Sequence, residues 1–169
     1  MAAGPSKRLA CDTNFPLDLA DGLEVAHDFR EVCRERGYSL FIAPTSIQEL
    51  VALSEEGSAR QQALAVKALT SLLSWGITPF DLEPVQHGLA ENFSRLLRTR
   101  HLLPFEEVND GLILGEAALA GIPLLVTADS HLLDIEGSQL AIAFADSHLS
   151  AVAVLHPRQM LRVLSGKRK

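Results

Sequence analysis

The sequence predicts an α/β fold: a three-layer α/β/α sandwich with a central, mainly parallel sheet. Short, continuous apolar runs alternate along the chain with segments of helical spacing. Strands that are buried on both faces have this apolar character, and their alternation with helices is typical of parallel βα units. The 169 residues suit one domain, and no repeat, linker or low-complexity segment divides them. We therefore expect a single domain over residues 8–165, with a disordered lead over 1–7 and a basic tail over 166–169.

The expected strands are the apolar runs of the chain. Buried strands are predicted over Arg8–Cys11, Ser39–Pro44, Leu124–Thr127, Leu140–Ala145 and Ala151–Leu155, and a short extended piece over Ile77–Leu82. The first run, RLAC, is followed by Asp12-Thr13-Asn14, which we interpret as a tight turn.

The expected helices lie between these strands. Apolar residues at helical spacing and common end signals predict helices over Leu17–Arg36, Thr45 to about Ser54, Ala59–Ser74, Pro84–Arg100, Glu106–Ala120 and Pro157–Leu164. Pro16 suits the start of the first helix, in which Gly22 is a weak point. Thr45 and Gln48 have the spacing of a capping box, with Thr45 as the N-cap.

Charge and cysteine content narrow the classes of function. The formal net charge is −6, whereas proteins that bind nucleic acid mainly through phosphate contacts are usually basic. Any nucleic-acid contact is therefore expected through a local patch or a brief encounter. The two cysteines, Cys11 and Cys33, lack CxxC spacing and predict neither a metal knuckle nor a disulfide framework. No signal segment and no run of about 18 apolar residues is seen, so we expect no membrane contact and a reduced, cytoplasmic protein.

Four acidic residues are expected at one edge of the sheet. Asp12 follows the first strand, and Asp129 follows the strand over Leu124–Thr127. Glu49 and Asp110 lie in the first turns of two helices, one after the second strand and one leading into the strand before Asp129. Both helix starts lie at the carboxyl edge of a parallel sheet, where the sites of open α/β sheets form. We therefore predict that four carboxylates from distant segments face one cleft.

Carboxylates that gather in this way favour a cation. Their mutual repulsion would push each of them toward the neutral form. Mg²⁺ and Mn²⁺ prefer oxygen ligands and suit such a cluster. A divalent cation can activate a bound water and polarise a phosphoryl oxygen, and two cations about 3.5–4 Å apart can hold both the attacking and the leaving oxygen. The cluster therefore predicts metal-dependent hydrolysis of phosphodiesters.

Three segments of the chain resemble a known family. LACDTN, PTSIQEL and VNDGLILGEAALAGIPLLVTADSHLL, in this order, are similar to the motifs of PIN domains, which are small metal-dependent ribonucleases. The resemblance extends from about Leu9 to Leu155. It implies a PIN-like fold and a Mg²⁺ or Mn²⁺ cofactor. It also implies that Asp12, Glu49, Asp110 and Asp129 are the catalytic and metal-binding acids, with supporting roles for Asn14, Asn109 and Thr127.

The same resemblance implies partners. It implies an RNA substrate, a role as the toxin of a toxin–antitoxin pair, an antitoxin tail that inserts an Arg into the acidic cleft, and a homodimer. Basic side chains that could guide RNA phosphates are Arg95, Arg98 and Arg100, with Lys167, Arg168 and Lys169 in the tail. A solvated helix face and a frayed terminus explain these basic residues equally well.

Each acid taken singly also has a purely structural explanation. An acid near a helix N-terminus contributes about 0.3–1 kcal/mol to stability, which covers Glu49 and Asp110, and Asp12 suits a turn. Two other functions stay open: a Mg²⁺-dependent phosphatase or phosphotransfer domain with Asp12 as nucleophile, although no D-x-D follows the first strand, and an inactive PIN-like binding module. The sequence lacks HExxH, GxGxxG and GxSxG motifs, which removes support for zinc-protease, nucleotide-cofactor and serine-hydrolase chemistry.

Overall fold

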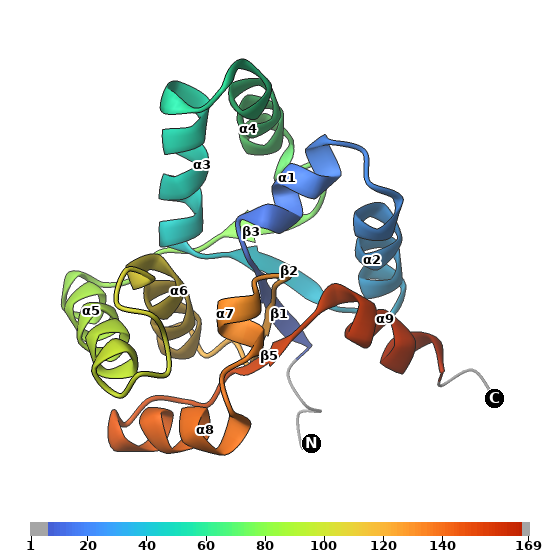
Figure 1. The fold of residues 1–169 in the computed structure, drawn as a ribbon. Helices are drawn as coiled ribbons and strands as arrows, with labels where there is room; N and C mark the ends of the chain where they lie inside the picture. Colours follow the sequence, from blue (N-terminus) through green and yellow to red (C-terminus); the bar gives the residue numbers. More distant parts are fainter. Residues whose placement is uncertain (1–6, 167–169) are drawn as a thin grey trace.

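One five-stranded sheet organises the computed structural model, which describes residues 7–166 (Figure 1). Its strands are β1 (Arg8–Cys11), β2 (Ser39–Ile42), β3 (Ile77–Pro79), β4 (Leu124–Val126) and β5 (Ala153–Leu155), in the order β3-β2-β1-β4-β5. Every neighbouring pair of strands is parallel, so the predicted fold class is confirmed. The short piece expected over Ile77–Leu82 joins the sheet as β3. Apart from Lys7 and Gly166, the predicted lead and tail lie outside the described residues.

Helices cover both faces of this sheet. They are α1 (Asn14–Ala20), α2 (Glu24–Glu35), α3 (Pro44–Glu56), α4 (Ala59–Ser71), α5 (Pro84–Thr99), α6 (Val108–Leu119), α7 (Ser130–Leu133), α8 (Gly137–Asp146) and α9 (Pro157–Ser165). One core lies between the sheet and α1, α2, α3, α4 and α9, and the other between the sheet and α5 to α8 (Figure 1). β1 serves both cores, because Leu9 and Cys11 face the first and Ala10 the second. None of these helices has the length and apolar character needed to cross a membrane.

The predicted strand over Leu140–Ala145 is wrong, because this segment lies in α8. The Glu136 side chain accepts hydrogen bonds from two backbone N–H groups of the first turn, at 3.1 and 2.9 Å, and so caps the helix. Ile142 is 52% exposed, whereas the side chains that face the core recur at helical spacing: Leu140, Ala143 and Phe144. Short apolar runs do not separate strand from helix by periodicity alone.

The predicted single helix over Leu17–Arg36 is also wrong, because it is two helices. The chain leaves α1 after Ala20 and enters α2 at Glu24. Between them Gly22 has a φ of +75°, a conformation that glycine adopts without steric cost. The weak point noted in the sequence is therefore a corner, and it lets α1 and α2 cover different parts of the sheet.

The predicted N-cap at Thr45 is wrong as well. α3 begins at Pro44, so its N-cap is Ala43, two residues before Thr45, and Ala43 has no side chain able to accept a hydrogen bond. The Thr45 hydroxyl instead donates to Oε2 of Glu116 on α6, at 2.8 Å. The start of α3 is thus held by a neighbouring helix.

Helices α5 and α6 approach each other closely beside Asp110. A Cβ atom on Gly111 would lie 2.4 Å from Ser94 Oγ and 2.8 Å from Ser94 Cα. The Ser94 hydroxyl donates to the backbone oxygen of Val108 at 2.8 Å, which holds the first turn of α6 against α5. Because Gly111 follows Asp110 directly, this contact sets where the Asp110 carboxyl lies.

We predict that Gly111→Ala lowers the free energy of unfolding by about 1–3 kcal/mol, because the added methyl must displace the Ser94 backbone. Urea unfolding measures the change. Gly88→Ala in α5 is the matched control: a Cβ there meets nothing within 4 Å, so it should raise stability by about 0.5–1 kcal/mol. Equal stability of the two variants would contradict the close packing of α5 on α6.

Candidate metal centre

Asp12 and Asp129 lie where the strand order of the sheet reverses. β1 has β2 on one side and β4 on the other, and the crevice outside two such strand ends is where open α/β sheets bind ligands. Asp12 directly follows β1, and Asp129 comes three residues after the end of β4. The backbone N–H of Asp12 donates to the backbone oxygen of Val126 at 3.1 Å. The two strand ends are therefore held together just below the acids.

Thr127 joins these two acids. Its hydroxyl donates to Asp12 Oδ2 at 2.6 Å and accepts from the backbone N–H of Asp129 at 3.0 Å. Asp12 Oδ1 accepts from the backbone N–H of Thr13 at 2.6 Å. Burial raises the pKa of Asp12, which is 4% exposed; the bonds from Thr127 and Thr13 lower it in part, and the charge of Asp129 raises it. Asp12 is thus a firmly positioned carboxyl with little access to water.

Glu49 on α3 belongs to the same cluster. Its Oε1 accepts from the Thr13 hydroxyl at 2.8 Å, and Thr13 is the residue whose N–H holds Asp12. Burial raises the pKa of Glu49, hydrogen bonds from Thr13 and Asn109 lower it, and the charges of Asp12 and Asp129 raise it. Asn109, predicted to support the site, therefore lies beside Glu49.

Asp110 in the first turn of α6 completes the cluster. Its side chain is 8% exposed, and within residues 7–166 its Oδ2 atom has no hydrogen-bond partner. Burial raises the pKa of Asp110 to about 8, and the charges of Asp129, Asp12 and Glu107 act in the same direction. The structure thus brings the four acids predicted from distant segments to one edge of the sheet.

The oxygen atoms of this cluster are suitable ligands for a divalent cation, although the carboxylates are not arranged around a common point. Among the described residues, no three His, Cys, Asp or Glu side chains stand in the arrangement of a metal site. Some carboxylate oxygens are taken by local partners: Asp129 Oδ1, for example, accepts from the backbone N–H of His131 at 2.8 Å. In the same part of the chain none of the four acids forms an ion pair with Lys or Arg. The unpartnered Asp110 oxygen and the uncompensated charge are what Mg²⁺ or Mn²⁺ would satisfy.

Of the other predicted site residues, two lie at the acids and one does not. Thr127 and Asn109 contact the acids, as described above. Asn14 is exposed at the first residue of α1, and its side chain forms no hydrogen bond with the four described acids. Its predicted role therefore has no contact to support it, whereas the neighbouring Thr13 reaches both Asp12 and Glu49.

The predicted basic cluster, Arg95, Arg98 and Arg100, makes local contacts near the end of α5. Arg100 pairs with Asp146 of α8 at 2.8 Å. Arg98 donates to the backbone oxygen of Phe105 at 3.3 Å and lies over the Phe105 ring. Arg95 is exposed and bonds Asn92 weakly, at 3.4 Å. The structure does not bring these arginines to the carboxylates, and the basic residues 167–169 lie outside the described range.

Three further polar residues near these acids or on α6 were not predicted. Thr13 lies in the segment that the sequence predicts as a turn. Glu107 adds negative charge beside Asp110 and lies 3.5 Å from the His131 imidazole. Glu116 is 3% exposed on α6. A single acid inside the apolar run ILGEAAL was a signal that could have found Glu116, since a carboxylate on a buried helix face needs a partner.

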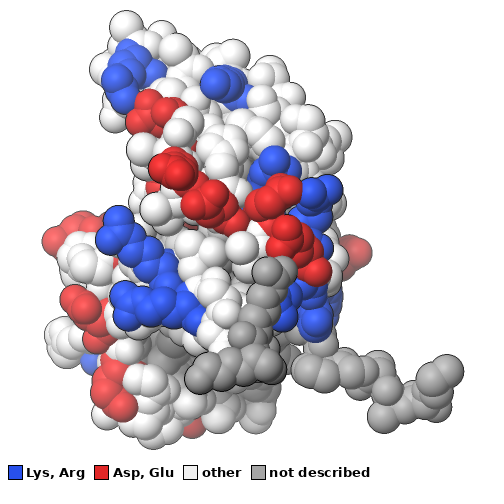
Figure 2. Space-filling model, turned by 90° about the vertical axis from the view of Figure 1, so that its right-hand side faces the viewer, with Lys and Arg blue, Asp and Glu red and all other residues white. Residues whose placement is uncertain are grey.

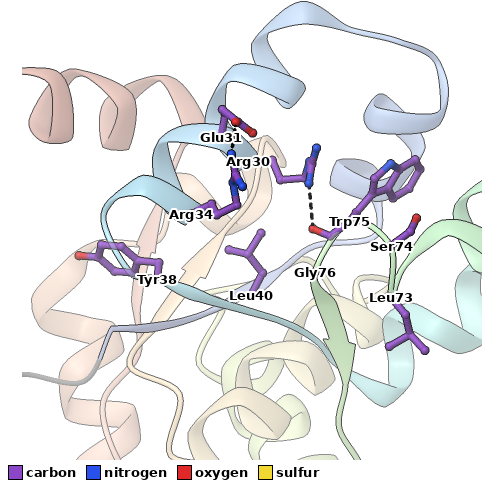
Figure 3. Close-up of a pocket in the computed structure, with 9 residues that line it drawn as sticks. All are labelled: Arg30, Glu31, Arg34, Tyr38, Leu40, Leu73, Ser74, Trp75 and Gly76. Atoms are coloured by element: carbon purple, nitrogen blue, oxygen red, sulfur yellow. Dashed lines mark hydrogen bonds and ion pairs between the residues drawn. The ribbon is translucent and has the colours of Figure 1, made fainter.

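Charged groups elsewhere are mixed in sign. The side that carries α2 and α9 shows a band of Asp and Glu with Lys and Arg on both sides of it (Figure 2). A cavity of about 530 Å³ lies between α2 and the turn before β3, at the amino ends of β2 and β3 (Figure 3). There Arg34 pairs with Glu31, and Arg30 donates to the backbone oxygen of Trp75 at 3.4 Å. Arg34 thus has an acidic partner, whereas Arg30 bonds a backbone oxygen and its buried Nε has no partner among the described residues. The lining holds a single acid, Glu31, so the carboxyl edge with its four acids is the candidate site.

Fold and site together define a class: an α/β/α protein whose open parallel sheet carries a carboxylate cluster at its switch point. The sequence matches no protein-family model and no curated protein. Solved structures resemble it. VapBC2 from Rickettsia felis, bound to a DNA fragment from their promoter, has a TM-score of 0.61 and 15% identity, over 88% of this chain and 98% of that chain.

Two further solved structures are similar. VapBC-1 from nontypeable Haemophilus influenzae has a TM-score of 0.54 and 10% identity, over 89% of this chain and 98% of that one. FitAcB from Neisseria gonorrhoeae has a TM-score of 0.50 and 18% identity, over 88% and 97%. At these identities the likeness concerns the fold, and it agrees with the PIN-like α/β/α arrangement expected from the sequence.

We predict that Asp110→Asn stabilises the metal-free protein, and more so as the pH rises. The folded pKa is about 8, whereas the unfolded value lies near 3.9. The folded state therefore holds the extra proton, and the stability of the parent falls as the pH rises from about 4 to about 8. Asn does not ionise and escapes this loss.

The melting temperature in EDTA between pH 5 and pH 8.5 measures this effect. Asp28→Asn, at an exposed position of α2, is the control and should change the melting temperature by the same small amount throughout. If the difference in melting temperature between Asp110→Asn and the parent stays constant with pH, the pKa of Asp110 is not raised in the folded protein.

Proposed function

We propose that the protein is a Mg²⁺- or Mn²⁺-dependent endoribonuclease that hydrolyses RNA phosphodiesters. The observation that carries the proposal is the convergence of Asp12, Glu49, Asp110 and Asp129 at the switch point of the sheet. One buried oxygen of this cluster has no partner, and no Lys or Arg of the described range neutralises it. The motif resemblance to PIN domains supports the choice of RNA.

The side chains of the site have two roles: some would hold the cation, and others orient the carboxylates. When bound, the divalent cation supplies Lewis acidity and an activated water at neutral pH. The four carboxylates would hold the cation. Thr127 and Thr13 orient Asp12, while Thr13 and Asn109 orient Glu49. Such outer contacts keep ligand oxygens in place and tune metal affinity.

A protein partner is part of the proposal. The resemblance to PIN toxins favours a toxin–antitoxin pair, with an antitoxin segment whose Arg enters the acidic cleft, and a homodimer of this chain. VapBC2 of similar fold was solved on a DNA fragment from their promoter. If this protein also forms such a complex, its antitoxin partner would bind the DNA. The present chain has a net charge of −6 and surface charges of mixed sign, which do not favour contact with phosphates (Figure 2).

The test is cleavage of labelled RNA by the purified protein with Mn²⁺. We expect cleavage by the parent and a loss of at least about a hundredfold in Asp12→Asn and Asp129→Asn. Metal-assisted charge stabilisation is worth several kcal/mol, and about 2.7 kcal/mol is already a hundredfold in rate. EDTA should abolish cleavage and excess Mn²⁺ should restore it.

Asp28→Asn, far from the cluster in sequence and exposed on α2, is the control and should cleave like the parent. Equal cleavage by all variants would point to a contaminant or another centre. A trapped aspartyl-phosphate on Asp12 would favour the phosphotransfer alternative, and Mn²⁺ binding without cleavage would favour an inactive binding module.

A further inference from the structure

Glu116 is a buried carboxylate that the proposed chemistry does not use. It lies on α6, six residues after Asp110, and is 3% exposed. Its two oxygens accept from one residue: Oε1 from the Thr45 backbone N–H at 3.1 Å, and Oε2 from the Thr45 hydroxyl at 2.8 Å. Burying a carboxylate is costly unless it is well paired, so this two-point contact is what keeps Glu116 inside.

The contact takes the place of a missing helix cap. Ala43 at the N-cap of α3 offers no side-chain acceptor. The first N–H groups of a helix lack partners within the helix and favour negative charge. Glu116 supplies that charge from another helix, and the start of α3 lies beside α6 (Figure 1). The two helices are therefore joined by a charge-assisted contact.

These two helices each carry an acid of the cluster. Glu49 lies four residues after Thr45, about one helical turn, and Asp110 opens α6. Asn109, next to Asp110 in the first turn of α6, lies close enough to Glu49 to lower its pKa, so the helices approach each other at a second point. Because each helix moves as a rigid element, the Glu116–Thr45 contact sets the separation of the Glu49 and Asp110 carboxyls.

We infer that Glu116 is a positioning residue for the metal centre: through Thr45 it holds Glu49 and Asp110 at the spacing that a divalent cation needs. The inference rests on the proposed function, since it concerns the same four acids. Glu116 itself touches neither the cation nor the RNA. Its removal should therefore weaken the binding of Mn²⁺ out of proportion to any loss of stability.

The experiment is Mn²⁺ titration of the full chain by calorimetry, with the melting temperature of each metal-free variant measured beside it. Glu116→Leu can accept neither bond from Thr45, and we expect Mn²⁺ affinity to fall about tenfold or more, as when outer-shell partners of ligands are lost. Thr45→Val loses the hydroxyl and should weaken Mn²⁺ binding, whereas Thr45→Ser keeps both donors and should retain it.

Ile113→Val is the matched control. It removes one buried methyl from α6, so it lowers stability without touching Thr45 or the acids, and its Mn²⁺ affinity should equal that of the parent. Parent-like Mn²⁺ affinity in Glu116→Leu would overturn the inference. It would also be overturned if Ile113→Val lost as much Mn²⁺ affinity per degree of lowered melting temperature as Glu116→Leu does.

The outcomes separate this inference from the proposed function. If the parent binds Mn²⁺ and Asp12→Asn does not, the metal centre stands, and the Glu116 and Thr45 variants alone decide the positioning role. If the parent binds no Mn²⁺, the proposed function fails and the positioning role fails with it. If Glu116→Leu does not fold, the comparison of Thr45→Val with Thr45→Ser decides: equal affinity in the two variants overturns the inference.

Discussion

Repulsion between like charges in a poorly solvated crevice is the constraint around which this structure is organised. Asp12, Glu49, Asp110 and Asp129 approach from four separate segments, and none of them has a basic neighbour in the described range to offset its charge. Groups in such a place gain from neutralisation by a proton or a cation. A fold selected for stability alone would disperse these acids or pair them with arginine, so their proximity supports the metal-binding role proposed above.

Contacts between neighbouring strands and helices hold the acids in position. Thr127 ties the end of β4 to Asp12, and Thr13 ties the end of β1 to Glu49. Close packing at Gly111 fixes the start of α6. These contacts lie outside the two hydrophobic cores, which are built from aliphatic and phenylalanine side chains on either face of the sheet. The contact at Gly111 thus contributes both to stability and to the position of Asp110, so a change there alters both.

The acids could be predicted from the sequence because the topology of a parallel sheet determines where strand ends and helix starts meet. The prediction needed only short apolar runs followed by Asp12 and Asp129, and helices that begin near Glu49 and Asp110. Two local features could not be predicted from the sequence. LAIAFA forms a helix because the second core buries one side of it, which its composition does not reveal. Thr45 looked like a cap because its real partner, Glu116, lies 71 residues away in sequence.

The hydrogen bond between Thr127 and Asp12 closes a loop of 115 residues, and β1 sits at the centre of the sheet while its neighbour β4 comes late in the chain. Contacts of such long range form slowly, and during synthesis they must wait until both segments have left the ribosome. A nascent chain interrupted before residue 110 carries Asp12 and Glu49 but neither of the other two acids. Translation products that end before residue 129 therefore lack a complete set of the four carboxylates.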